Sequence, residues 1–203
     1  MPEMLEPLLD HLVLGTPDLD ATVDAFAAAT GVRPVEGGRH DRWGTRNYLV
    51  GLGGTSYLEF LGRDPEADRT VEWPFPFDEE RLFTWAIHPD DADSFVATAR
   101  AAGVDFGPLT QLSRRNANGA ELSWRVTKFL YDGVVPFLID WGDAPHPTTD
   151  LPTVELSDFS ATHPQADEVQ AVLATLFLTL PVEPGPVRLI ATLRGPQGLY
   201  LCL

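Results

Sequence analysis

The segment LDHLVLGTPDLDATVDAFAAATG, from Leu9 to Gly31, decides the fold because two later segments repeat its pattern. It reads as an apolar strand, a proline, an acid-rich helix start and a helix that ends at a glycine. The same order returns in LFTWAIHPDDADSFVATARAAG (Leu82 to Gly103) and in VELSDFSATHPQADEVQAVLATLF (Val154 to Phe177). Repetition of this kind predicts a chain built from three similar structural units.

The rear part of each unit repeats as well. A glycine-containing turn and an apolar strand close all three units: GGTSYLEFL (Gly53 to Leu61), GVVPFLIDW (Gly133 to Trp141) and GPQGLYLCL (Gly195 to Leu203). Further strand-like stretches lie between the helix and this last strand. We therefore expect an α+β fold with tandem βαβββ units and a third, smaller βαββ unit at the C-terminus.

Proline-rich segments separate the units. They predict a first unit over residues 1–64, a second over 65–145 and a third over 151–203, all in one compact chain. The last strand of the third unit carries no charge, so this unit needs a surface to cover. We expect it to pack on the first two units, and we expect a fragment that ends at Thr149 to aggregate. Both a monomer and a homodimer are compatible with this pattern.

The composition narrows the choice of partners. With 14 basic and 30 acidic residues among 203, the formal net charge is -16. Such a surface repels nucleic acid and anionic membranes, so neither is expected as a partner. A single cysteine excludes a disulfide framework and a cysteine-based zinc site. The acidic first residues and the lack of a long apolar run predict a cytoplasmic protein.

Three stretches carry a family resemblance: DHLVLGTPDLDATVDAF (Asp10 to Phe26), GGRHDRWGTRNYLVGLG (Gly37 to Gly53) and GGTSYLEFL (Gly53 to Leu61). They resemble the vicinal oxygen chelate superfamily of glyoxalase I, extradiol dioxygenases and bleomycin-resistance proteins, and within it the glyoxalase-like domain proteins. The resemblance covers residues 8–141 best. It implies a U-shaped cleft between two units, in which side chains from the first and last strand of each unit hold a divalent metal.

In the first unit these positions fall on His11 and Glu59. Strand alternation puts both on the face opposite the apolar residues that meet the helix, so we expect them within reach of each other on the concave face. In the second unit the same positions hold Phe83 and Ile139, which are not ligands. Imidazole and carboxylate suit Zn, Fe, Ni, Co or Mn. The site therefore either takes a third ligand, such as His40, or holds no metal.

A basic cluster, RHDRWGTRN (Arg39 to Asn47), stands out in this acidic chain. We predict that Arg42 or Arg46, with His40, borders the cleft and binds an anionic group of the substrate through guanidinium hydrogen bonds. Asn47 is a further candidate donor to the substrate. The alternative is a surface hairpin whose arginines neutralise nearby acids and whose asparagine completes a turn.

Trp124 and Arg125 are predicted to line the second half of the cleft, as an apolar wall and an anion anchor. The alternative places the tryptophan in the core and the arginine on the surface. His88 and His163 each precede a proline at a strand-to-helix turn, where helix capping is expected, and His146 lies in a loop. None of these three histidines is assigned a role.

Two functions from different classes fit these residues. The first is a glyoxalase-like enzyme, of the lyase, isomerase or dioxygenase type, that acts on a small oxygenated and anionic molecule. In it a metal at His11 and Glu59 polarises the substrate, or Glu59 or His40 acts as a general base. The second is a metal-free small-molecule binding protein of the bleomycin-resistance type. Its cleft would be walled by four tryptophans: Trp43, Trp85, Trp124 and Trp141.

Overall fold

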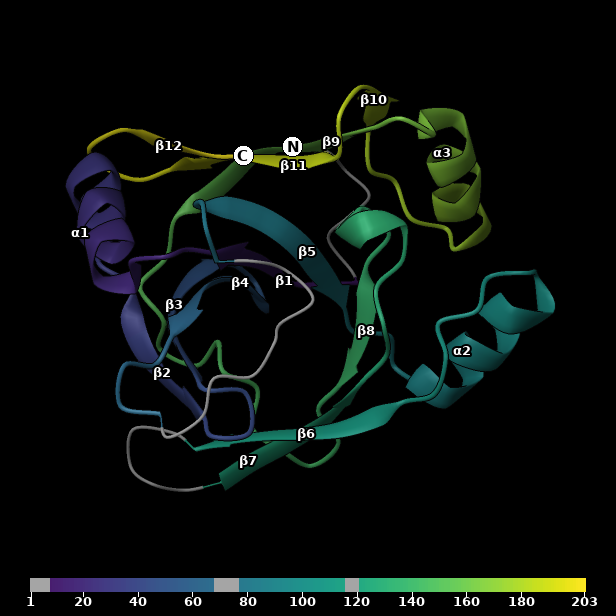
Figure 1. Cartoon of the computed structure of the whole chain (residues 1–203), viewed down its shortest axis with the longest axis horizontal. Helices are drawn as coiled ribbons and strands as arrows, with labels where there is room; N and C mark the ends of the chain where they lie inside the picture. Colours follow the sequence, from purple (N-terminus) through teal and green to yellow (C-terminus); the bar gives the residue numbers. More distant parts are fainter. Residues whose placement is uncertain (1–7, 68–76, 116–120) are drawn as a thin grey trace.

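A computed structural model describes residues 8–67, 77–115 and 121–203 of the chain. Eight of its strands form a closed barrel in the order β1-β4-β3-β2-β6-β7-β8-β5 (Figure 1). The first unit contributes four neighbouring strands: β1 (Leu9–Gly15), β2 (Val35–His40), β3 (Thr45–Gly53) and β4 (Ser56–Arg63). The second unit contributes the other four: β5 (Arg81–Ile87), β6 (Thr110–Arg115), β7 (Glu121–Val126) and β8 (Phe137–Asp140).

The two halves of the barrel meet along two seams. On one side β1 pairs with β5 in antiparallel fashion and with β4 in parallel fashion, so β1 is central to that side. On the other side β2 pairs with β6 at Arg39 and Arg115. Because both seams are paired, the eight strands form a closed barrel without a free edge. The predicted α+β class with tandem βαβββ units is confirmed, and the two units close into a barrel.

Helices α1 (Leu19–Thr30) and α2 (Ala92–Ala101) lie outside the barrel (Figure 1). Asp18 and Asp91 begin them, since each carboxylate accepts a hydrogen bond from a backbone N–H of the first turn. The first helix ends at Gly31, where a φ of 77° favours a residue without a Cβ. None of the described helices combines the length and the hydrophobicity that crossing a membrane requires.

The third unit forms a separate four-stranded sheet in the order β10-β9-β11-β12. Its elements are β9 (Glu155–His163), α3 (Ala166–Thr175), β10 (Val182–Pro184), β11 (Arg188–Arg194) and β12 (Leu199–Cys202). In Figure 1 this sheet crosses one side of the barrel, with β12 beside α1. Backbone hydrogen bonds from Val154 to Gly51 and from Leu82 to Leu203 join it to the barrel. The third unit thus packs on the first two within the chain, as expected.

One hydrophobic core fills the space between the barrel and the elements that cover it. Its most buried members come from all three units: Phe26, Phe60, Trp85, Phe159 and Leu173. The three units share this core, so they are repeats within one folded body. The unit boundaries at residues 64, 145 and 151 stay a prediction. The aggregation of a fragment without the third unit also stays a prediction.

Candidate functional site

A cavity of about 410 Å³ lies inside the barrel, and this size is ordinary for a small-molecule site. Its two sides differ in chemistry. The polar wall consists of one residue from each of β1, β2, β3, β4 and β6: His11, His40, Asn47, Glu59 and Arg114. The apolar wall comes from the second unit: Phe83, Trp124, Phe137, Ile139 and Trp141. Four of the five residues of the polar wall therefore come from the first unit, and Arg114 comes from the second.

His11 and Asp10 are neighbours in β1, and yet their side chains touch. The pairing of β1 with β5 shifts between Leu9 and His11, which marks a β-bulge at Asp10. The bulge allows Nδ1 of His11 to lie 2.5 Å from Oδ1 of Asp10. An ionised carboxylate can only accept a hydrogen bond, so Nδ1 carries a proton, and in the neutral form of the ring Nε2 keeps a free lone pair.

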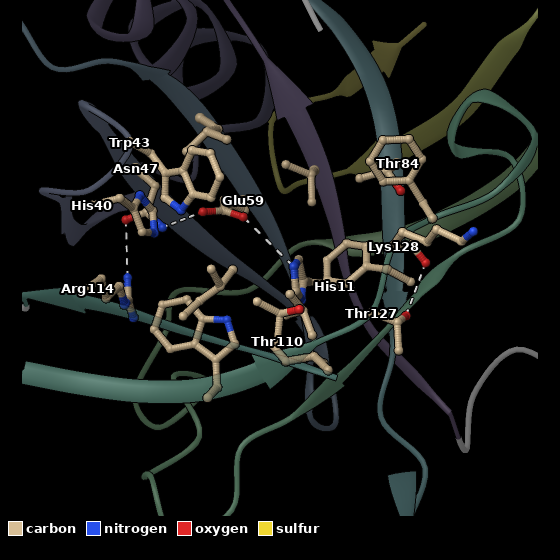
Figure 2. Close-up of a pocket in the computed structure, with 18 of the residues that line it drawn as sticks. His11, His40, Trp43, Asn47, Glu59, Thr84, Thr110, Arg114, Thr127 and Lys128 are labelled. Atoms are coloured by element: carbon tan, nitrogen blue, oxygen red, sulfur yellow. Dashed lines mark hydrogen bonds and ion pairs between the residues drawn. The ribbon is translucent and has the colours of Figure 1, made fainter. Parts of the chain in front are cut away.

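Glu59 faces His11 across the polar wall (Figure 2). Its Oε2 lies 3.8 Å from Nε2 of His11, and its Oε1 accepts a hydrogen bond of 2.5 Å from Nδ2 of Asn47. Oδ1 of Asn47 accepts in turn from Nη1 of Arg114 at 3.2 Å. His11 and Glu59 are thus within reach of each other, as expected, and the polar groups form one connected series from Asp10 to Arg114.

The electrostatics fix the charge of two groups in this series. Burial by itself would raise the pKa of Asp10, but hydrogen bonds, above all from His11 and His146, outweigh it and hold this pKa well below its ordinary value. Burial lowers the pKa of His40. Near neutral pH the first group is therefore a carboxylate and the second a neutral imidazole.

Aromatic rings hold the imidazole of His11 in place. Tyr57 stacks on it with a centroid distance of 4.7 Å and an interplanar angle of 16°, and Phe137 meets it edge-on at 5.5 Å. Burial raises the pKa of the Tyr57 hydroxyl well above its ordinary value, so this group stays neutral. The carboxylate on one ring nitrogen and the contacts with Tyr57 and Phe137 together hold His11 in this orientation.

Because Gly37 in β2 has no side chain, Asn47 and Arg114 of the polar wall can occupy the space beside it. A Cβ at this position would lie 2.4 Å from Oδ1 of Asn47 and 2.7 Å from Nη1 of Arg114. Real Cβ atoms do not approach other atoms so closely, so any side chain here would displace the hydrogen bond between these two residues. The glycine is thus part of the site although it offers no functional group.

The structure brings five of the predicted site residues to the cavity and leaves three outside. His40, Asn47 and Trp124 line it together with His11 and Glu59. Their proximity is a structural fact, whereas their roles in binding or catalysis stay predictions.

The three arginines proposed as anion anchors do not line the cavity. Arg42 is exposed on a turn, Arg46 forms an ion pair with Asp20 at 2.6 Å, and Arg125 forms one with Asp140 at 2.5 Å. The last two each adjoin an inward-facing residue of the same strand, and strand alternation turns them outward. The guanidinium of the site belongs to a different residue.

The tryptophans also divide. Trp43, Trp124 and Trp141 line the cavity, but Trp85 does not. Trp85 lies in the core outside the barrel, where its Nε1 donates a hydrogen bond of 2.9 Å to the carbonyl of Val134. It therefore cannot wall a binding cleft.

The described residues do not fit the metal centre that the superfamily resemblance implies. His11 and Glu59 are ligand types, but the equivalent positions of the second unit, Phe83 and Ile139, present only carbon to the cavity. Within the described part of the chain, no third His, Cys, Asp or Glu completes a close ligand set with the first two. Metal centres with such ligands have at least three of them, so His11 and Glu59 by themselves do not make up such a centre.

Arg114 and Asp10 are site residues that sequence patterns did not single out. Arg114 reaches the first unit because β2 and β6 meet at the seam, and Asp10 contacts His11 because of the bulge. The alternation in β6, which puts Leu112 and Arg114 on one face, is a signal that identifies the arginine once the strand is known.

Comparisons with known proteins agree with this fold. The glyoxalase-like domain family matches residues 9–177. The chain belongs to this family. A hypothetical protein from Staphylococcus aureus resembles this glyoxalase-like domain with a TM-score of 0.64 and 15% identity, over 96% of this chain and 84% of that one. At this identity the likeness shows the fold alone.

Two epimerases are more distant in structure. A methylmalonyl-CoA epimerase from Streptomyces coelicolor, in complex with 2-nitronate-propionyl-CoA, is 25% identical over 68% of this chain and 97% of its own, with a TM-score of 0.44. The methylmalonyl-CoA epimerase from Mycobacterium tuberculosis is 17% identical over 71% and 93%, with a TM-score of 0.43. A search of curated proteins finds no match to this sequence. The family supports an enzyme or a binding protein of the glyoxalase superfamily.

Proposed function

We propose that this glyoxalase-like domain is an enzyme that moves a proton on a small carbonyl compound in the barrel cavity without the help of a metal there. The pair of Asp10 and His11 carries the proposal, because it leaves a free ring nitrogen directed at Glu59 within the polar wall. The reaction class is abstraction of a proton from the carbon next to a carbonyl, as in an isomerase or a lyase.

His11 is the proposed base. A general base needs a lone pair in reach of the substrate and a fixed tautomer, and the hydrogen bond to Asp10 supplies the second condition. The same carboxylate stabilises the imidazolium that forms when Nε2 takes the proton. Asp10 contacts the ring on the side away from Glu59, so it is a positioning residue.

Glu59 is the proposed second proton carrier. The 3.8 Å between its Oε2 and Nε2 of His11 is too long for a direct hydrogen bond. A substrate hydroxyl or a migrating proton fits between the two atoms. When His11 removes the proton from carbon, the electron pair of the C–H bond moves onto the carbonyl oxygen and forms an enolate. Return of the proton at a neighbouring atom, from either group, completes an isomerisation.

Arg114 is the proposed partner of the negative oxygen. Its side chain is buried, its Nη1 is held by Asn47, and its Nε has no hydrogen-bond partner among the described residues. A fixed, buried cation next to the place where charge develops is an effective form of transition-state stabilisation. The opposite wall is dominated by aromatic and aliphatic side chains, so the preferred substrate has an apolar or aromatic body and a single oxygenated head.

A binding protein is the second candidate, and the apolar wall is the observation that favours it. Trp124 and Trp141 lie against each other at 5.4 Å between ring centroids and offer a broad aromatic surface. A compound held there would need no reaction at the polar wall. A protein that binds the compound without converting it would therefore be a binding protein and not an enzyme.

Phenylpyruvate is a suitable probe because it joins a phenyl ring, an acidic CH₂ group, a carbonyl and a carboxylate. In D₂O, we expect the protein to accelerate the exchange of its CH₂ protons for deuterium, measured by proton NMR. We expect the acceleration to vanish in His11→Ala and to fall strongly in Glu59→Gln.

Binding supplies the control for this experiment. Phenylpyruvate affinity, measured by calorimetry, should change little in Glu59→Gln, since this variant keeps the size of the side chain. Tight binding by the wild type with exchange no faster than in buffer would contradict the enzyme and favour the binding protein.

A further inference from the structure

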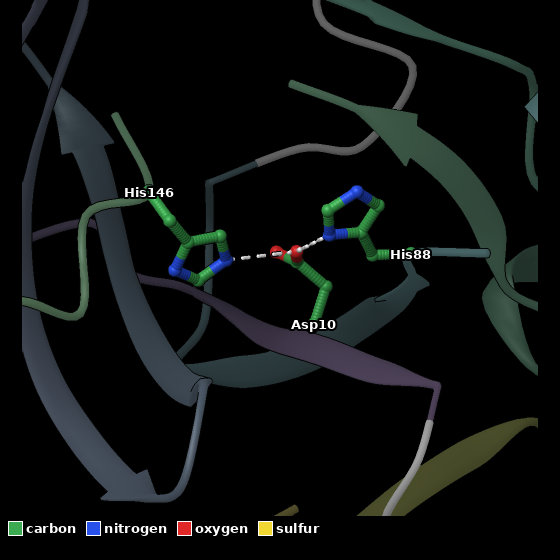
Figure 3. A group of neighbouring side chains, drawn as sticks. All are labelled: Asp10, His88 and His146. Atoms are coloured by element: carbon green, nitrogen blue, oxygen red, sulfur yellow. Dashed lines mark hydrogen bonds and ion pairs between the residues drawn. The ribbon is translucent and has the colours of Figure 1, made fainter. Parts of the chain in front are cut away.

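We propose that Asp10, His88 and His146, here called the rim cluster, bind one divalent transition-metal ion at an end of the barrel, outside the cavity (Figure 3). Their ligand atoms all lie within 4.8 Å of one another, and no other group of His, Cys, Asp or Glu in the described residues does so with three members. None of the three residues lines the cavity. The rim cluster adjoins the proposed reaction only through Asp10, whose other carboxylate oxygen contacts His11.

The topology explains why these residues meet. Asp10 lies at the start of β1, His88 follows the end of the antiparallel β5, and His146 follows β8, which is parallel to β5. One edge of the barrel therefore gathers all three. The backbone N–H of His88 donates to the carbonyl of Leu8 at 2.8 Å and fixes that corner.

The distances suit a shared ion. Oδ2 of Asp10 lies 3.1 Å from Nε2 of His146 and 3.6 Å from Nδ1 of His88. Bonds of about 2.0–2.1 Å to zinc place two ligands of a tetrahedral ion about 3.3 Å apart, and the two observed separations lie on either side of this value. The longer one exceeds a normal hydrogen bond, so direct hydrogen bonding does not account for the approach of His88.

The donor set and the exposure point to a transition metal with an open position. Two imidazoles and one carboxylate suit zinc, iron, cobalt or nickel rather than calcium or magnesium. The side chain of His88 is 41% exposed and that of His146 is 22% exposed. Three protein ligands with access to solvent leave a fourth position for water.

Neighbouring groups orient the ligands from behind. Nδ1 of His146 lies 2.9 Å from the hydroxyl of Thr148 and accepts a hydrogen bond of 3.4 Å from the backbone N–H of Thr148. Nε2 therefore carries the proton that it shares with Oδ2 of Asp10 at 3.1 Å, and a metal ion would take the place of this proton. Nε1 of Trp141 donates to Oδ2 of Asp10 at 2.9 Å, and Oδ1 of the same carboxylate binds His11. Such outer contacts are typical of metal ligands and raise the affinity of a site.

The test uses the full chain without a polyhistidine tag, stripped of metal by a chelator. Zinc is titrated by calorimetry, and cobalt(II) is titrated by its visible absorption. We expect one ion per chain, with zinc displacing cobalt. We expect His88→Ala and His146→Ala each to weaken zinc binding at least about tenfold. Both side chains are partly exposed, and thermal unfolding verifies that each variant is folded.

Two matched controls locate the ion. His163→Gln changes a histidine at the end of β9, in the third unit and outside the rim cluster, and Glu59→Gln changes the ligand-type carboxylate of the cavity. Unchanged zinc binding in both supports the rim cluster. Loss of binding in Glu59→Gln, retention of full affinity in both alanine variants, or no zinc binding by the wild type would each overturn the proposal.

Discussion

The two walls of the cavity come from the same structural unit used twice, and yet the equivalent positions of the two units differ in chemistry. In the first unit, β1 and β4 present His11 and Glu59 to the cavity. In the second, the equivalent strands β5 and β8 present Phe83 and Ile139. A repeated backbone thus fixes where side chains point, while the sequence at those positions decides whether a wall reacts or only packs against the ligand.

This difference separates two tasks. The polar wall is held by hydrogen bonds among Asp10, His11, Glu59, Asn47 and Arg114. The apolar wall is held by the packing of aromatic and aliphatic rings and chains. We therefore expect substitutions in the first to change catalysis and charge, and substitutions in the second to change ligand affinity. The following predictions test this division, from the largest expected effect to the smallest.

The largest effect is expected from equivalent substitutions in the two walls. His11→Ala removes the proposed base and should lower the rate constant of phenylpyruvate exchange at least about 100-fold, the lower end of general-base contributions. Phe83→Ala removes only contact area, so it should raise KM with a much smaller change in kcat. Exchange rates measured over a range of phenylpyruvate concentrations give both constants. Equal losses of kcat in the two variants would contradict the division.

A second test compares the stability of the two walls. Asn47→Leu leaves Glu59 and Arg114 without their shared partner, and we expect a loss of about 2–3 kcal/mol in the free energy of unfolding, since unpaired buried polar groups are costly. Ile139→Val in the opposite wall deletes one methylene group and should cost about 0.5–1.5 kcal/mol. Urea unfolding followed by tryptophan fluorescence measures both. A smaller loss for the asparagine variant would show that the hydrogen-bonded series contributes little.

The third test uses the pH dependence of stability. Burial, with a smaller contribution from Arg114, lowers the pKa of His40 below its ordinary value of 6.5, whereas Glu59 and Asp41 oppose this shift. The unfolded chain therefore binds this proton more tightly than the folded one. The stability linked to His40 is fully present above about pH 6.5 and is lost as the pH falls toward the lower pKa of the folded state, by up to about 1.4 kcal/mol per pH unit.

His40→Gln is the matched variant for this measurement. It should flatten that part of the stability curve between about pH 7 and pH 5, measured by urea unfolding in a series of buffers. The acid loss that comes from Asp10, whose pKa is also lowered, belongs to a more acidic range and should persist in the variant. Superimposable curves for the variant and the wild type would contradict a buried, neutral His40.

The smallest effect is expected outside the barrel. Arg46 pairs with Asp20, whose side chain is 64% exposed, and exposed pairs contribute about 0.2–1 kcal/mol. Arg46→Ala should therefore lower the stability by no more than this and leave the affinity for phenylpyruvate unchanged. Arg114→Lys, by contrast, should weaken phenylpyruvate binding in calorimetry. A clear loss of phenylpyruvate affinity in Arg46→Ala would show that this arginine contributes to binding, contrary to the prediction.

The sequence alone determined the fold and half of the site, because both depend on local periodicity. Asp18, Asp91 and Gly31 mark helix ends through capping chemistry that acts within a few residues. Strand alternation was sufficient to put His11 and Glu59 on one face, and the repeat showed which strands correspond. Strand alternation also indicates that Arg46 and Arg125 point away from the cavity, since their neighbours Asn47 and Trp124 face inward.

Only the tertiary structure decided the remaining contacts, because they join strands and loops that are distant in the sequence. Arg114 reaches Asn47 because the barrel closes at the seam between β2 and β6. His88 and His146 meet Asp10 because one edge of the barrel gathers three chain segments. The bulge at Asp10 depends on how β1 pairs with β5, and no local pattern encodes such a register. Local patterns fix where a side chain points along its own strand, whereas barrel closure determines which side chains it meets.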